Sequence, residues 1–149
     1  MTNSEKNTAT LTHLSSLTQY FIPFGNFIFP AILWSSKKED SPFIDFHGKQ
    51  VLNFQLSIFL YSLFLALIGF FILLFTILNG IDFSFTNGSE FIFKNLSNGN
   101  ISAMVMMGIV CISLCFILKF LEFFLIIYAA VKASNGENYH YPLTINFLK

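Results

Sequence analysis

The sequence contains no arginine and few charged residues of any kind. Charged side chains make up 11% of the 149 residues, whereas about a quarter is typical of soluble domains. Eight lysines balance eight acidic residues, so the chain has no basic excess that would attract nucleic acid. Hydrophobic residues reach 54% and include 21 phenylalanines. This composition predicts an integral membrane protein that has the lipid bilayer as a partner and does not bind nucleic acid.

Cysteine is scarce as well, and this excludes a disulfide framework. Cys111 and Cys115 lie four residues apart in an apolar run, so they share one face of one helix and fit packing better than a two-thiol metal site. The three histidines, His13, His47 and His140, show no metal-ligand spacing. Nucleophile, zinc-protease and phosphate-loop motifs are also missing. We therefore expect a protein that is not an enzyme, with no catalytic residue, metal or cofactor.

The densest polar chemistry leads directly into a long apolar segment at residues 41–55. Ser41 can cap a helix, Pro42 suits its first position, and Asp45 suits its first turn. These signals predict an interfacial-to-transmembrane helix over residues 42–78. A polar stripe at i, i+4 spacing continues along it and requires a protein partner or water. The stripe consists of Asp45, Lys49, Asn53 and Ser57, with His47, Gln50 and Gln55 beside it.

Two interpretations exist for each polar position of this helix. His47 is either a proton-responsive group or headgroup ligand, or an ordinary interfacial residue that is wetted on one side, which we favour. Gln50, Asn53 and Gln55 either line a path for a substrate or hold helices together by hydrogen bonds. We favour the second interpretation for these three residues.

The N-terminal part predicts a short polar tail, residues 1–9, and then a broken segment, residues 11–34. Proline and glycine at residues 23–26 divide this segment into two pieces, each shorter than the ~20 residues that a membrane span needs. It therefore forms either a re-entrant helical hairpin or a kinked span. Asn26 can cap the second piece, and Pro30 is expected to kink it. We expect the Asn53 face of the next helix to cover this break.

A second transmembrane helix is predicted over residues 101–133, with Asn135-Gly136 as its stop signal. Lys119 and Glu122 lie inside it at i, i+3 spacing, so we expect them to pair and to face the protein interior, opposite the polar stripe. Residues 137–149 are aromatic and amphipathic, which predicts an interfacial tail.

Residues 79–100 form a polar loop in this scheme. Alternating phenylalanines on both sides of Asn87-Gly88 fit a β-hairpin, and an irregular aromatic loop fits equally well. The whole chain then reads as an all-α integral membrane protein with a single membrane domain over residues 1–149. If residues 11–34 re-enter, the lysines place both termini in the cytoplasm, and if they span, the bias weakens only slightly. In the re-entrant case, one side holds Lys6, Lys37, Lys38, Lys49, Lys132 and Lys149, and Lys94 faces the other; in the spanning case, Lys6 moves across.

Three blocks of sequence share a recognisable pattern: Gly25, Asn26 and Pro30 in the first block, Pro42 and Phe54 in the second, and Gly136, Tyr141 and Pro142 in the third. Together they resemble a small bacterial membrane-protein family, mostly without assigned function, that is similar to the Tic-twenty subunit of the chloroplast inner-envelope translocon. The resemblance implies a multi-pass architecture, and we expect the bacterial cytoplasmic membrane as the location.

Two functional hypotheses follow from these observations. The preferred one is a non-enzymatic membrane subunit with a structural, assembly or translocation-accessory role beside a larger membrane complex. The alternative is a small homo-oligomeric transporter or conduit, which requires self-association because two full spans and one broken segment enclose little volume. The partner is accordingly either another membrane protein or further copies of the chain.

Overall fold

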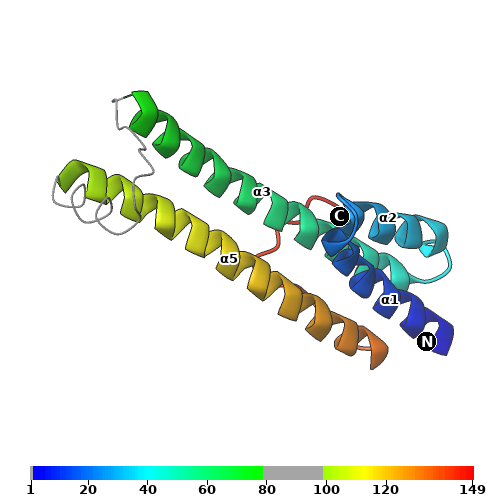
Figure 1. Ribbon diagram of the computed structural model, residues 1–149. Helices are drawn as coiled ribbons and strands as arrows, with labels where there is room; N and C mark the ends of the chain where they lie inside the picture. The colour runs from blue at the N-terminus through cyan, green and yellow to red at the C-terminus, as the bar shows by residue number, and fades with distance from the viewer. Residues whose placement is uncertain (1, 79–98) are drawn as a thin grey trace. The chain divides into compact units, whose positions relative to one another are not determined.

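The computed structural model describes residues 2–78 and 99–149, and every regular element in these ranges is helical (Figure 1). The predicted all-α class, with a broken N-terminal segment and two long apolar helices, is confirmed. The hairpin and loop alternatives concern residues 79–98, which lie outside the described ranges. The elements are α1 (Asn3–Ser15), η1 (Ser16–Tyr20), α2 (Gly25–Lys37), α3 (Pro42–Leu78) and α5 (Gly99–Ser134).

The chain divides into two compact units, which we describe separately. Unit 1 comprises Met1–Leu60 and Lys119–Lys149, and unit 2 comprises Tyr61–Leu118. Unit 1 therefore holds α1, η1, α2, the first part of α3, the last part of α5 and the C-terminal segment 135–149, hereafter the tail. The single membrane domain over residues 1–149 stays a prediction.

The first helix begins earlier than the sequence suggested. Thr2 and Glu5 form a capping box, in which the Thr2 hydroxyl accepts from the Glu5 N–H and the Glu5 carboxylate accepts from the Thr2 N–H. This box satisfies two backbone donors, so α1 starts at Asn3. The polar tail predicted over residues 1–9 was therefore wrong, because its polar residues start a helix.

A tight turn separates η1 from α2. Phe24 at this turn has a left-handed backbone with φ 61°, and α2 begins at the next residue. A Cβ on Gly25 would lie 2.6 Å from the Thr18 hydroxyl, so the glycine permits the close approach of α2 to η1. Asn26 is not the predicted cap, since Phe24 holds that position. Pro30 lies buried within α2.

The start of α3 agrees with the prediction. The Ser41 hydroxyl accepts from the Phe43 N–H at 3.3 Å, and the helix begins at Pro42. Asp45 pairs with Lys49 one turn later, with 2.6 Å between the carboxylate and the ammonium. Asp45 also accepts from the Trp34 indole at 2.9 Å, which joins α2 to α3.

The end of α5 agrees as well. Gly136 has φ 82°, its N–H donates to the Ala133 carbonyl, and the Glu137 N–H donates to the Lys132 carbonyl. This pair of bonds is the glycine-dependent helix stop that the sequence predicted at Asn135-Gly136, and the helix ends at Ser134, one residue later than expected.

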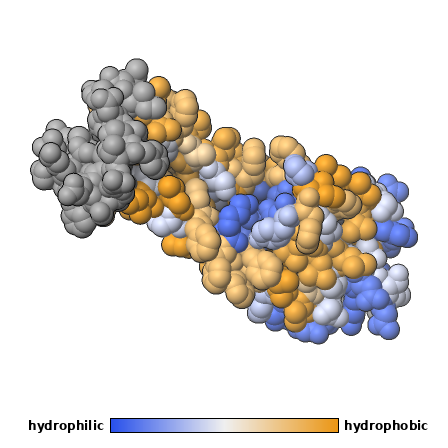
Figure 2. All heavy atoms as spheres, in the orientation of Figure 1, coloured by the Kyte–Doolittle hydropathy of each residue, from blue (hydrophilic) through white to orange (hydrophobic). Residues whose placement is uncertain are grey.

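Two helical segments are long and apolar enough to cross a membrane. They are Pro42–Phe75, with 34 residues, and Met106–Ser134, with 29 residues, whereas a span needs about 20. In unit 2 these helices expose large apolar side chains; Ile112 and Phe116 are each 73% exposed. Figure 2 shows apolar residues over most of the visible helical surface. Such a surface fits lipid or other membrane helices.

The packing of α2 on α3 generates a stability prediction. A Cβ on Gly48 would lie 2.1 Å from Cδ1 and 2.8 Å from Cβ of Trp34, near the base of a rigid side chain. We expect Gly48→Ala to lower the free energy of unfolding by about 1–3 kcal/mol through overpacking.

Gly69→Ala is the matched control, because Gly69 lies in the same helix and a Cβ there meets nothing within 4 Å. Gly69→Ala should leave the free energy of unfolding unchanged or raise it, since alanine is more favourable than glycine in a helix by about 1 kcal/mol. Thermal unfolding in mild detergent, followed by circular dichroism, measures both variants. Equal effects of the two substitutions would contradict the packing argument.

Candidate functional site

A chain of three buried aromatic groups crosses the centre of unit 1. His13 of α1 lies between His47 of α3 and Tyr141 of the tail. Its Nε2 is 2.8 Å from Nδ1 of His47, and its Nδ1 is 2.8 Å from the Tyr141 hydroxyl. Both imidazoles are fully buried, and Tyr141 is 5% exposed. One consistent proton assignment has Tyr141 donating to His13 and His13 donating to His47.

Other aromatic rings surround this chain. Phe43 makes an edge contact with His47 at 4.3 Å between ring centroids, and Phe54 stacks on Tyr141 at 4.1 Å with 7° between the planes. Burial, followed by the neighbouring His47, holds the pKa of His13 well below its ordinary value. Burial also raises the pKa of Tyr141. His13 and Tyr141 are therefore neutral near neutral pH and act as hydrogen-bonding groups.

The tail supplies the partner that the polar stripe of α3 requires. The Asn53 side chain accepts from the N–H groups of Phe147 and Leu148, at 3.1 and 2.8 Å, and donates to the Leu148 carbonyl at 3.0 Å. The Ser57 hydroxyl accepts from the Ile145 N–H at 2.8 Å. These bonds hold the tail backbone along α3. The interfacial position of the tail stays a prediction.

A different residue of α3 contacts the broken segment. Gln55 accepts from the Asn26 side chain of α2 at 2.7 Å. We expected Asn53 to cover the break, but Gln55, two residues later and on nearly the opposite side of α3, contacts α2, whereas Asn53 binds the tail. Gln50 also serves the tail, because it accepts from the Tyr141 N–H at 3.4 Å.

The pair on α5 forms, but its surroundings differ from the prediction. Lys119 donates to Glu122 at 2.8 Å; the Glu122 side chain is fully buried, and that of Lys119 is 47% exposed. The Gln19 amide of η1 donates to the other Glu122 oxygen at 2.8 Å. The predicted interior position holds for the Glu122 side chain but was wrong for Lys119, and the position opposite the polar stripe stays a prediction. Glu122 is buried against η1, and Lys119 stays half in the open.

Sequence reasoning missed His13 and Gln19 and misread His47. The histidines are spaced too far apart in the chain to suggest a contact, and no local signal marks Gln19 as the partner of a carboxylate. His47 is fully buried, so the half-wetted imidazole that we favoured is wrong, whereas its interfacial position stays a prediction. His140 is exposed and packs on the Phe46 ring at 4.9 Å. In the described ranges, no group of three or more metal-ligating side chains is placed to hold an ion.

These features define an integral membrane protein in which a compact, internally hydrogen-bonded unit joins two long apolar helices. The chain belongs to the MamF/MmsF family, the magnetosome magnetite crystal formation protein family, whose model matches residues 4–148. No curated protein gives a match. No solved structure gives one either.

This match overturns the resemblance to the Tic-twenty family. The motif positions that suggested it mark helix starts, helix stops and buried contacts: Pro42 starts α3, Gly136 ends α5, and Phe54 stacks on Tyr141. Residues that start a helix, end a helix or pack in the interior also occur in unrelated membrane proteins, so they do not identify a family. Pro142, the last of them, is exposed.

The burial of His13 predicts a pH-dependent stability. Below pH 6.5, its ordinary pKa, the unfolded chain binds a proton that folded His13 does not bind. The free energy of unfolding should therefore fall as the pH falls, by about 1.4 kcal/mol per pH unit for this group until the pH reaches its folded pKa. Denaturant unfolding over a pH series in detergent measures the slope.

In the variant His13→Gln, the dependence of the unfolding free energy on pH should lose the contribution of this one histidine. His47 and Tyr141 face His13 in both proteins, so only the contribution of residue 13 changes. Identical slopes for the wild type and His13→Gln would contradict the argument.

The contacts of Glu122 predict an asymmetric mutant cycle. Lys119→Ala leaves a buried carboxylate with Gln19 as its remaining partner, so it should cost about 1–3 kcal/mol of unfolding free energy. Adding Glu122→Gln removes the uncompensated charge and should recover most of this loss. Unfolding of the single and double variants in detergent measures the coupling, and additive effects would show that the pair is not coupled.

Proposed function

We propose that this chain is a non-enzymatic membrane subunit of the magnetosome that supports the formation of magnetite crystals in a structural or assembly role. The family match over residues 4–148 carries this proposal. Because the match extends over both apolar helices and nearly all of unit 1, it concerns the described architecture as a whole rather than one motif.

The contacts of unit 1 favour a structural role over a reactive one. Asn53, Ser57 and Gln55 use their side chains to bind the tail and α2. Both nitrogens of His13, Nδ1 of His47 and the Glu122 carboxylate are likewise engaged within the protein. The unit thus uses its polar groups to maintain its own shape. The apolar helical faces of unit 2 remain for lipid and for helices of a larger membrane complex.

The conduit hypothesis ranks second. Residues 61–78 and 99–118 contain no acidic, basic or histidine side chain. Ion pathways through membrane helices usually carry ionisable residues. A pore formed by self-association of these segments would therefore offer a poor path to protons or iron ions.

We also propose that both termini lie on one side of the membrane, in the cytoplasm. His13, near the N-terminus, contacts Tyr141 of the tail, and both belong to unit 1. This contact favours a re-entrant or surface arrangement of α1 and α2 over a full span. A cysteine placed before Leu11 tests this topology by its accessibility to a labelling reagent. A cysteine that reacts only with reagent added outside the cell would refute the cytoplasmic position of the N-terminus.

Deletion of the gene in its native host tests the function. We expect fewer or smaller magnetite crystals, because the family acts in their formation. The wild type and Gly69→Ala should restore the crystals, since a Cβ at residue 69 meets nothing. Asn53→Leu should not, since it removes three hydrogen bonds to the tail. Electron microscopy measures crystal number and size, and unchanged crystals in the deletion strain would refute the proposal.

Crosslinking and mass spectrometry of native membranes distinguish the two functional hypotheses. A recurring heterologous membrane protein is the expected result. Crosslinks between copies of this chain alone would reverse the order of the hypotheses.

A further inference from the structure

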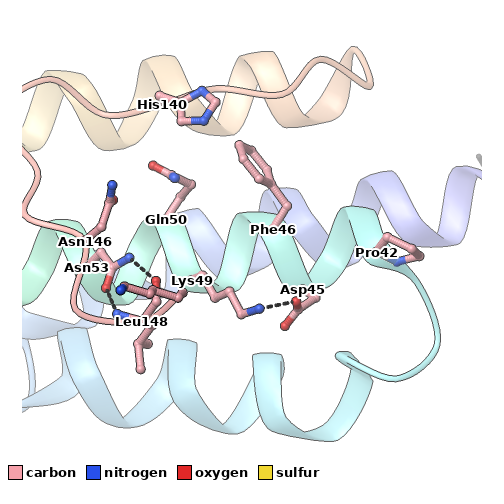
Figure 3. A pocket seen from close by; sticks show the side chains of 10 residues that line it. Pro42, Asp45, Phe46, Lys49, Gln50, Asn53, His140, Asn146 and Leu148 are labelled. Carbon is pink, nitrogen blue, oxygen red and sulfur yellow. Dashed lines mark hydrogen bonds and ion pairs between the residues drawn. The ribbon is translucent and has the colours of Figure 1, made fainter.

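A cavity of about 380 Å³ lies between the first turns of α3 and the tail. The hydrogen-bond network of unit 1 borders it without filling it. Figure 3 shows side chains of α3 along one side of the cavity and His140 and Asn146 of the tail on others. All of its lining residues belong to unit 1.

Hydrogen-bond donors dominate the polar lining. Lys49, Lys149 and His140 supply nitrogen donors, and the amides of Gln50 and Asn146 add more. Lys149 has no ion pair within the described residues. The Gln50 oxygen is engaged by the Tyr141 N–H, which leaves its amide nitrogen for another partner. Among the lining residues, Asp45 is the acidic side chain and pairs with Lys49, which leaves the charge of Lys149 unpaired, so the lining suits an anion.

The position of the cavity indicates the source of this anion. Asp45 and Lys49 are the last charged residues of α3, because residues 50–78 contain no acidic or basic side chain. In a membrane helix the change from charged to apolar residues marks the headgroup region. Phe46 and Leu148 also line the cavity and add apolar surface beside the donors. A ligand with both a phosphate and an apolar part fits this arrangement.

We propose that this cavity binds the phosphate of a membrane phospholipid headgroup. The ammonium groups of Lys49 and Lys149 contact the phosphate oxygens, and the amide groups donate hydrogen bonds to them. Bound lipid fixes the first turns of α3 and the end of the tail at the membrane surface. The proposal does not depend on the role in crystal formation, so either one can fail alone.

Titration of the full chain in mild detergent with phosphatidylglycerol, followed by native mass spectrometry, tests the proposal. Each lysine near an anionic lipid surface contributes about fivefold in affinity. Lys149→Gln should therefore weaken binding about fivefold, and Lys49→Gln with Lys149→Gln about 25-fold. The double variant Lys37→Gln with Lys38→Gln removes the same charge outside the cavity and should bind like the wild type. Equal losses in the two double variants would overturn the proposal.

Asp45→Asn provides a test that misfolding cannot imitate. The substitution keeps an oxygen acceptor for the Trp34 indole and removes the carboxylate that pairs with Lys49. Lys49 then no longer shares its charge with a carboxylate, and the cavity loses one negative charge, so binding of the phosphate should tighten by up to about fivefold. A damaged fold would bind more weakly. Unchanged or weaker binding would contradict the proposed role of Lys49.

Two competitors separate the possible ligands. Inorganic phosphate at the concentration of the lipid should not displace phosphatidylglycerol, because it lacks the apolar part. Displacement by it would overturn the assignment to a lipid. A fatty acid of matched chain length carries a carboxylate instead of a phosphate and should bind more weakly. Equal binding of the fatty acid would overturn the assignment to a phosphate.

Discussion

The hydrogen bonds between the polar stripe of α3 and the tail are the interaction on which unit 1 depends. An amide or hydroxyl in an apolar environment costs several kcal/mol when it lacks a partner. Asn53 and Ser57 meet this requirement with backbone N–H and carbonyl groups of residues 145–148. The tail backbone in turn gains partners outside any helix. Each side therefore satisfies the other, which explains why a long apolar helix contains so many polar residues at one end.

Buried polar side chains of the N-terminal helices also form hydrogen bonds with other parts of unit 1. His13 bonds with both His47 and Tyr141, so α1, α3 and the tail share one buried chain of groups. Asn26 and Gln55 join α2 to α3, and Gln19 joins η1 to Glu122 of α5. Polar groups inside and apolar side chains outside are the arrangement that a bilayer favours. The broken segment is thus part of a folded unit rather than an isolated hairpin.

The difference between the two units fits the proposed role. Unit 1 has the hydrogen bonds that define a fixed shape, whereas the helices of unit 2 present apolar surfaces. A membrane subunit that supports crystal growth needs a stable folded structure and apolar helix surfaces that can pack against lipid or other membrane helices. The donor-lined cavity at the start of α3 adds a way to anchor that form at the lipid headgroups.

The sequence by itself determined the membrane class, the start of α3 and the end of α5, because composition, caps and helix stops act within a few residues. The Asp45–Lys49 and Lys119–Glu122 pairs were also readable, since they lie one helical turn apart. The early start of α1 was readable too, but we overlooked its capping box. Only the tertiary structure decided that His13 meets Tyr141, 128 residues away, and that Asn53 binds the tail rather than the broken segment. Such contacts depend on how whole helices pack, and a single sequence carries no local signal for the partner of a buried polar group.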